Sequence, residues 1–240
     1  MAAVSGRTTL GRLVAERPAA AAVLEQYGID YCCGGKRSLE EACREKGINV
    51  DELLHQIVQR EAEARKRAAE PATNWLERPL SQLCDHIEQT HHAYLRNELP
   101  RLSALMEKVV ATHAQKHPEL HELHRVFNEL RRELETHMIK EEHVLFPAIR
   151  RLEQDALPAA FPFGSVANPI GVMEAEHESA ARALERIREL TAGYRVPEDA
   201  CEAYRALLNG LRELTFDLHR HIHKENHILF PRAVELERHR

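Results

Sequence analysis

The 240-residue chain has little of what marks β-sheet, secreted or membrane proteins. Aromatic residues make up only 5% of it, and it contains 10 glycines and 11 prolines. Leu, Ala, Glu and Arg dominate instead, which is the composition of helices. No apolar run approaches the roughly 20 residues of a membrane-spanning helix, and residues 1–10 lack the apolar centre of a secretory signal. We therefore predict an all-α protein with no membrane partner.

Cysteine and an excess of one charge sign are scarce as well. The five cysteines are odd in number and scattered, which argues against a disulfide framework. Reduced thiols indicate a reducing compartment, and hence a cytoplasmic location. The formal net charge of -5 has both signs interleaved along the chain. A phosphate-binding protein should concentrate Lys and Arg on one face, so no nucleic-acid partner is expected.

Histidine, in contrast, is abundant, with 16 residues, and it occurs in a repeated phrase. Residues 137–147 read HMIKEEHVLFP, and 84 positions further on the chain reads HIHKENHILFP. Each copy carries a histidine and a glutamate four residues apart, a spacing that returns to within about 40° of the same helix face. His137 with Glu141, and His221 with Glu225, can therefore each present two donors to one point.

The chain divides into a short N-terminal helical part and a longer C-terminal one. Residues 1–68 contain short helical patterns broken at DYCCGGK, with N-caps predicted at Ser38 and Asn49. Residues 69–78 are expected to form a linker. Residues 79–240 contain four long helical patterns, which is typical of a four-helix bundle. These patterns cover about 79–112, 118–153, 168–193 and 197–237, with a Pro/Gly-rich connection before the third.

Both His-Glu pairs fall in the apolar seams of their helices. The two seams are Leu130, Leu134, His137, Glu141, Val144, Ala148 and Leu214, Leu218, His221, Glu225, Ile228. This spacing is that of a buried stripe, and neither seam contains Lys or Arg. An uncompensated carboxylate in an apolar core costs several kcal/mol, so a bound metal is predicted. A surface ion pair, worth a few tenths of a kcal/mol, would explain one such motif better than a duplicated one.

The first and third long helices supply two further imidazoles, His92 and His177, each 44 or 45 residues before the histidine of the next helix. His91 competes with His92 for the first of these positions. Seven residues after His92 stands Leu99, whereas seven residues after His91 stands Glu98, on a polar face. We therefore predict His92 as the ligand.

Four imidazoles and two carboxylates suit a pair of iron or manganese ions bridged by the carboxylates. Zinc prefers fewer, tetrahedral ligands. The predicted metal ligands are His92, His137, Glu141, His177, His221 and Glu225. The other histidines near them are expected in a second layer or at the surface, and these are His91, His143, His219, His223 and His227.

The N-terminal part carries a second motif, Cys32-Cys33-Gly34-Gly35. Adjacent cysteines cannot easily close a disulfide with each other, and two glycines free the backbone that follows them. An exposed thiol pair at a turn is one interpretation. A purely structural tight turn is the other.

DYCCGGK in a short helical domain, followed by a bundle with HMIKEEHVLFP, EAEHE and HIHKENHILFP, resembles the RIC family, the di-iron proteins that repair iron-sulfur clusters. The resemblance covers nearly the whole chain. It implies a hemerythrin-like bundle whose non-haem centre binds two iron ions, with bridges at Glu141 and Glu225 and histidine ligands at the four positions predicted above. It also implies repair of clusters damaged by nitric oxide or peroxide, most simply by supplying iron, with Cys32 and Cys33 taking part in transfer or redox chemistry.

Three functions remain open on this basis. The first is a non-enzymatic iron donor, whose partners are damaged iron-sulfur proteins or the cluster assembly machinery. The second is a protein that binds or reduces nitric oxide, and the third is an oxygen-binding carrier or sensor. A carrier needs no cysteine-containing domain, so the N-terminal unit favours the first two. A homodimer through the N-terminal domain is also predicted.

Overall fold

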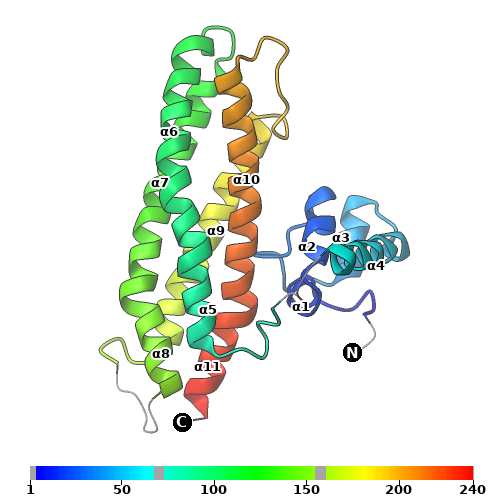
Figure 1. Cartoon of the computed structure of the whole chain (residues 1–240), viewed down its shortest axis with the longest axis vertical. Coiled ribbons are helices and arrows are strands. Elements are labelled where there is room, and N and C mark those ends of the chain that lie inside the picture. Colours follow the sequence, from blue (N-terminus) through cyan, green and yellow to red (C-terminus); the bar gives the residue numbers. More distant parts are fainter. Residues whose placement is uncertain (1–3, 68–72, 155–160, 240) are drawn as a thin grey trace.

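The computed structural model describes residues 4–67, 73–154 and 161–239. In these residues every regular element is a helix (Figure 1), which confirms the predicted all-α class. Within the predicted linker, residues 69–72 lie outside the described part of the chain, as do residues 155–160 of the predicted connection. No helix in the described ranges is long and apolar enough to span a membrane.

Short helices build the N-terminal domain, and both predicted caps are present. Ser38 forms a capping box with Glu41, and the Asn49 side chain accepts hydrogen bonds from the backbone N–H groups of Asp51 and Glu52. These bonds satisfy donors that a helix start leaves unpaired. The helices are α1 (Leu10–Glu16), α2 (Ala20–Gln26), α3 (Leu39–Lys46) and α4 (Val50–Arg67).

Long helical rods build the bundle, and consecutive rods run in opposite directions (Figure 1). The first comprises α5 (Leu80–Ile87), η1 (Glu88–His92) and α6 (Ala93–His113), and the second comprises α7 (Glu119–Lys140), η2 (Glu141–Leu145) and α8 (Phe146–Gln154). The third is α9 (Ala167–Leu190), and the fourth comprises α10 (Glu202–Lys224), η3 (Glu225–Leu229) and α11 (Phe230–Arg238). Helix α7 packs against α9, and α6 packs against α10.

The fourth rod begins later than predicted. Pro197 does not start the helix; its carbonyl accepts the N–H of Ala200 in a turn. Cys201 is then extended, with φ -73° and ψ 170°, and the helix starts at Glu202. The proline pattern therefore marked a turn rather than a first helical position.

The bundle interior consists of two apolar clusters with a polar layer between them. One cluster includes Leu95, Phe127 and Leu214, and the other includes Ile87 and Phe146. In each rod the chain passes from one cluster to the other through a buried histidine, glutamate or both. Burial of each large apolar side chain contributes roughly 1.5–3 kcal/mol to stability. Burial of an unpaired polar group costs free energy instead, so the polar layer is tolerated here only if its groups are paired.

Three π-helical turns, η1, η2 and η3, interrupt the rods at this polar layer. Each holds one residue more than an α-helical turn, because its hydrogen bonds run from i to i+5, and such turns are frequent at functional sites. In the second rod the extra residue shifts the apolar seam by one position, so the prediction of a buried Val144 is wrong. Val144 is 44% exposed, whereas Leu145 lies in the core and is 1% exposed. Ala148 and Ile228 are buried as predicted.

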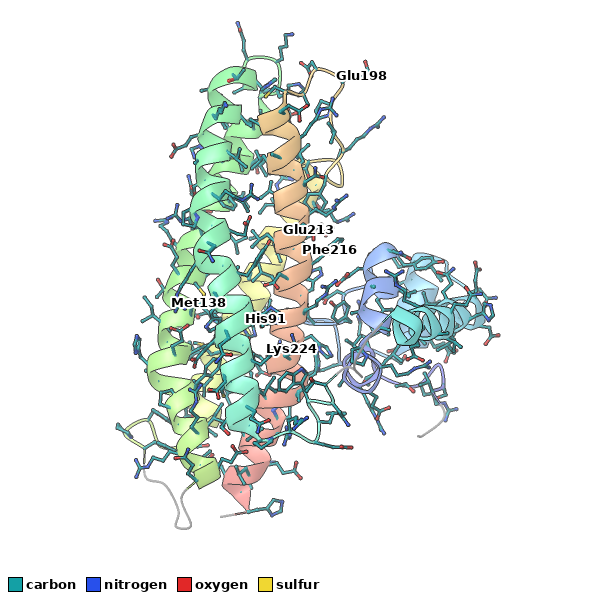
Figure 2. The ribbon with its side chains drawn as sticks, in the orientation of Figure 1. His91, Met138, Glu198, Glu213, Phe216 and Lys224 are labelled. Atoms are coloured by element: carbon teal, nitrogen blue, oxygen red, sulfur yellow. The ribbon has the colours of Figure 1, made fainter. Side chains whose placement is uncertain are left out.

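The N-terminal domain lies at the flank of the bundle, beside α10 (Figures 1 and 2). Its own core includes Leu10, Leu24, Tyr31, Leu39 and Leu53. Helix α1 contacts η3, the π-helical turn that begins at Glu225. The small domain is therefore packed directly against the part of the bundle that contains the polar layer.

Candidate metal centre

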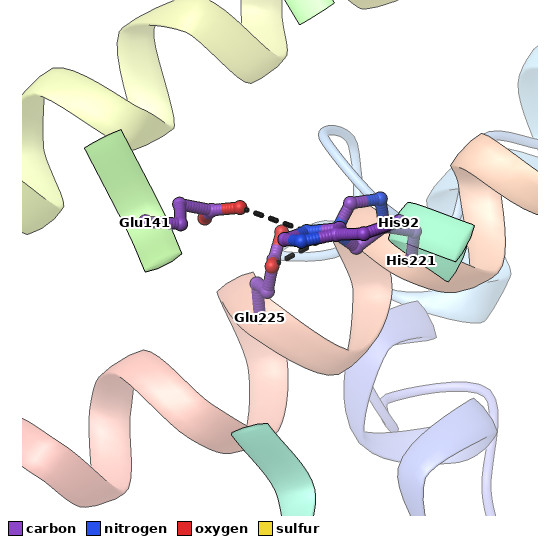
Figure 3. Close-up of side chains that lie close together, drawn as sticks. All are labelled: His92, Glu141, His221 and Glu225. Atoms are coloured by element: carbon purple, nitrogen blue, oxygen red, sulfur yellow. Dashed lines mark hydrogen bonds and ion pairs between the residues drawn. The ribbon is translucent and has the colours of Figure 1, made fainter. Parts of the chain in front are cut away.

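Six side chains meet in the polar layer, and they are the six predicted as metal ligands. They form two groups of four that share Glu141 and Glu225. The first group adds His92 and His221 (Figure 3), and the second adds His137 and His177; within each group, one ligand atom from each residue lies within 4.8 Å of the others. All six residues are buried, with at most 4% of their surface exposed.

All four imidazoles turn Nε2 toward the shared carboxylates. Nε2 of His92 and Nε2 of His137 lie 3.2 and 3.3 Å from Oε2 of Glu141. Nε2 of His177 lies 3.2 Å from Oε2 of Glu225, and Nε2 of His221 lies 2.9 Å from Oε1 of the same carboxylate. Each glutamate therefore faces one histidine of each group, as a bridge between two cations requires.

Several of these atoms approach one another without forming hydrogen bonds. This observation tests whether the six residues fit bound metal ions. Nε2 of His92, both carboxylate oxygens of Glu141 and Oε2 of Glu225 are buried with no hydrogen-bond partner among the described residues. Nε2 of His137 and Nε2 of His177 lie 3.2 Å apart, although at most one can donate to the other. Buried polar groups are rarely left unpaired, and two cations would satisfy this whole set.

The charges in the layer support the same conclusion. Burial and the neighbouring Glu225 raise the pKa of Glu141, but the imidazoles outweigh them and hold it below its ordinary value. Burial would lower the pKa of His137, whereas the Glu141 carboxylate reverses this and raises it to about 10. Without metal, protons on His92 and His137 compensate the buried Glu141 carboxylate. Metal ions would replace those protons, because ligating imidazoles must be neutral.

A second layer of acceptors, which the sequence interpretation missed, orients three of the four histidines. Nδ1 of His92 donates to Glu142 Oε1 at 2.7 Å, Nδ1 of His137 donates to Glu176 Oε2 at 2.9 Å, and Nδ1 of His177 donates to Asn226 Oδ1 at 2.8 Å. Such bonds fix the tautomer and make Nε2 the metal-binding nitrogen. One signal was available: Glu142 and Asn226 directly follow the two shared glutamates in the repeated phrase.

The Leu-Phe-Pro endings of the repeated phrase also have a place in the centre. The ring of Phe146 stacks on His92 at 5.8 Å, and that of Phe230 stacks on His177 at 5.9 Å. Each proline follows a π-helical turn by two residues. A proline cannot donate the hydrogen bond of an α-helix, so the π-helical turn lies where the α-helical ladder is already interrupted.

The additional histidines separate into surface, second-layer and interdomain groups. His143 is exposed, whereas His91 is buried beside His221. Half-buried His219 contacts the N-terminal domain, since its ring lies 6.1 Å from that of Tyr31. His223 donates from Nε2 to the Gly11 carbonyl at 2.9 Å.

His227 holds the turn that carries the cysteines. Its Nε2 donates to the Cys32 carbonyl at 2.6 Å. A Cβ at Gly35 would come within 2.2 Å of the His227 ring, and one at Gly11 within 2.4 Å. The glycine at position 35 thus allows close approach of the domains, and the sequence-based expectation that it mainly frees the backbone was incomplete.

The expectation of an exposed thiol pair is wrong for Cys32. This residue is 1% exposed, and its thiol donates to Asp30 Oδ1 at 3.1 Å. The adjacent Cys33 thiol, burial and the Asp30 carboxylate hold the pKa of Cys32 well above its ordinary value. Cys33 is less buried, and its Sγ lies 3.5 Å from the backbone carbonyl of His177. The structure therefore brings one of the two thiols to the helix that carries a candidate ligand.

Two comparisons with known proteins agree with this architecture. Residues 85–233 match the hemerythrin HHE cation binding domain, and residues 6–61 match a domain of unknown function, DUF542. An iron-sulfur cluster repair protein YtfE from Pectobacterium carotovorum subsp. carotovorum (strain PC1) is 39% identical over 231 residues, covering 95% of this chain and 97% of the relative. The YtfE of Escherichia coli O81 (strain ED1a) is also 39% identical, over 94% of this chain and 96% of its own.

The chain belongs to the family of hemerythrin-like proteins that includes these YtfE relatives. The predicted resemblance to the RIC family is confirmed, because the cysteine-containing domain and the bundle both match and the identity extends over nearly the whole chain. The cofactor prediction is confirmed as well: the centre is a non-haem site for two iron ions, formed by His and Glu groups positioned to hold them.

Replacement of His223 by Ala should leave the iron content at the wild-type level, because its Nε2 serves a carbonyl of the N-terminal domain. We expect looser packing of that domain, seen as faster proteolysis between residues 4 and 67. Iron analysis by mass spectrometry checks the first part. If His223→Ala loses iron as readily as His221→Ala, the ligand on α10 has been assigned to the wrong histidine.

Proposed function

We propose that this protein repairs iron-sulfur clusters damaged by nitrosative or oxidative stress, and that it does so by donating iron from the buried centre. The relatives named above are iron-sulfur cluster repair proteins, and they match this chain over nearly their whole length. We also propose that His92, His137, His177 and His221 are the terminal ligands and that Glu141 and Glu225 are the bridges. The protein then acts as a donor without catalytic turnover, and damaged iron-sulfur proteins are its partners.

One observation carries the donor role: the cysteine turn lies against the helix that supplies His177. The Cys33 thiol is 3.5 Å from the His177 carbonyl, and His227 fixes the turn through the neighbouring carbonyl of Cys32. Thiolates bind both iron and iron-sulfur intermediates. A thiol placed beside the centre, and in a different domain, suits transfer better than storage.

Holding iron, orienting its ligands and transferring it fall to different residues of the chain. The two bridging carboxylates provide negative charge in a layer where both are 0% exposed, so cations are held firmly while water is excluded. When bound, the iron pair supplies redox chemistry and an exchangeable metal. Glu142, Glu176 and Asn226 keep three imidazoles in the orientation that ligation requires. We assign the handover to Cys33 rather than Cys32, whose thiol stays protonated near neutral pH.

The test of the proposal is repair itself. Iron-loaded protein is mixed with a cluster-containing dehydratase inactivated by nitric oxide, after free nitric oxide has been removed, and recovery of dehydratase activity is followed. Nitric oxide consumption is measured in parallel. Recovery with iron-loaded but not iron-free protein supports donation. Rapid catalytic nitric oxide consumption without recovery would contradict it and favour a nitric oxide reductase.

Replacement of Cys33 by Ser should leave the iron content unchanged and slow cluster repair severalfold. Ser cannot offer a thiolate, whereas a cysteine can. The measurement is the repair assay beside iron analysis. Cys201→Ser is the matched control, because this thiol is exposed at the start of α10 and far along the rod from the centre. Full repair by Cys33→Ser would leave the motif as a structural turn.

A cytoplasmic location and a homodimer through the N-terminal domain stay predictions. The five cysteines are all free thiols, as a reducing compartment favours. Sedimentation at several protein concentrations measures the oligomeric state directly.

A further inference from the structure

The two halves of the bundle repeat with an offset of 84 or 85 residues, so each residue around the centre has a counterpart. The corresponding pairs are Glu142 with Asn226, Lys140 with Lys224, and Glu176 with His91. Glu142 and Asn226 play the same part, since each accepts the Nδ1 proton of a histidine. The third pair differs in chemistry, and the difference falls on the residue next to a candidate ligand.

Glu176 lies beside the metal position to which His137 and His177 belong. Its carboxylate accepts the Nδ1 proton of His137 at 2.9 Å and also pairs with Lys140. Since Asn226 accepts from His177 at 2.8 Å, both imidazoles of this position have an acceptor for Nδ1. His137 and His177 are therefore both held in the tautomer that a metal requires.

The His92–His221 position lacks one of these acceptors. Nδ1 of His221 is buried and has no hydrogen-bond partner among the described residues. Where the other half has Glu176, this half has His91, whose ring lies parallel to that of His221 with centroids 5.2 Å apart. Stacked rings do not exchange hydrogen bonds through their edges, so His91 accepts no hydrogen bond from Nδ1 of His221.

Both nitrogens of His91 are already engaged elsewhere. Nδ1 lies 2.8 Å from Asp217 Oδ1, which can only accept, and Nε2 lies 2.5 Å from Lys224 Nζ, which donates. Figure 2 shows His91 and Lys224 near each other on the two neighbouring rods. Lys224 thus contacts the histidine that stands in place of Glu176, whereas its counterpart Lys140 pairs with Glu176 itself.

We propose that the two iron positions are unequal and that the iron held by His92 and His221 is the one released first. Loss of one outer acceptor typically weakens metal binding by about 10- to 100-fold, and Nδ1 of His221 lacks that acceptor. Within the proposed repair function, on which this last step rests, that iron is the cargo and the His137–His177 iron stays behind. His91 is then a positioning residue that sets the lability of one metal.

The experiment measures iron release alone. Protein loaded with two irons is exposed to excess chelator, and released iron is followed over time. We expect two phases of equal amplitude, with rates that differ by about 10-fold or more. His91→Glu restores the carboxylate of the other half and should slow the fast phase toward the slow one. Glu176→Gln should accelerate the slow phase and leave the fast one unchanged.

Two controls keep the result interpretable. His143→Glu makes the same chemical change on an exposed residue two positions from Glu141, and it should leave both phases unchanged. Circular dichroism and the Mössbauer spectrum, in which the two irons should give distinct signals, verify that each variant is folded and loaded. Equal release of both irons from the wild type, or an unchanged fast phase in folded His91→Glu, would overturn the inference. The repair assay is independent of both outcomes.

Discussion

Replacement of His137 by Ala is expected to remove most of the iron from the purified protein. The change deletes one of the two imidazoles of its position, and the effect should exceed the roughly 10- to 100-fold loss of affinity typical of outer-layer changes. It also leaves the Glu141 carboxylate, which is 0% exposed, with less positive charge around it. Removing one partner of a buried ion pair costs about 3–5 kcal/mol, so the variant should also unfold at lower temperature.

The measurement combines metal analysis with thermal unfolding followed by circular dichroism. Helicity should persist, because the two apolar clusters on either side of the layer are unchanged. His143→Ala is the matched control, since it removes an exposed histidine of the same repeated phrase. Wild-type iron content in His137→Ala would exclude this residue as a ligand.

Replacement of Glu225 by Gln should abolish magnetic coupling between the two irons even where some metal remains. An amide keeps the volume of the side chain but lacks the charge and the second anionic oxygen with which a carboxylate bridges two cations. Glu225 lies 3.2 Å from His177 and 2.9 Å from His221. Among the described residues, Glu141 and Glu225 are the carboxylates that both groups of candidate ligands share. Glu141→Gln should behave in the same way.

Magnetic susceptibility or Mössbauer spectroscopy of the oxidised protein checks this expectation. Glu178→Gln supplies the control, because Glu178 is exposed and adjacent to a candidate ligand. An unchanged coupled spectrum in both bridge variants would mean that the bridges come from elsewhere.

The candidate ligands could be predicted because two independent signals coincide in the sequence. The repeated phrase places His137 and Glu141 in a seam of leucines, and the duplication then points to His177 and His92 in the remaining helices. Burial of charged groups at apolar positions needs compensation, so the pattern indicates chemistry without any knowledge of the fold. The helical class followed from composition and periodicity alone.

The rest depends on distances between segments that the sequence does not encode locally. The π-helical turn at 141–145 shifts the seam by one residue, and periodicity based on 3.6 residues per turn therefore misplaced Val144. Glu176 meets His137 from another rod, and the Cys32 carbonyl meets His227 across the contact between the two domains. Such contacts become predictable only once the packing of the rods is known.

Transfer of labelled iron tests the central claim most directly. The protein is loaded with ⁵⁷Fe, mixed with a dehydratase whose cluster nitric oxide has damaged, and the dehydratase is purified again and examined by Mössbauer spectroscopy. Iron donation predicts ⁵⁷Fe within the restored cluster and a matching loss of ⁵⁷Fe from the donor. A cluster restored without ⁵⁷Fe, while the donor keeps both of its irons, would contradict it.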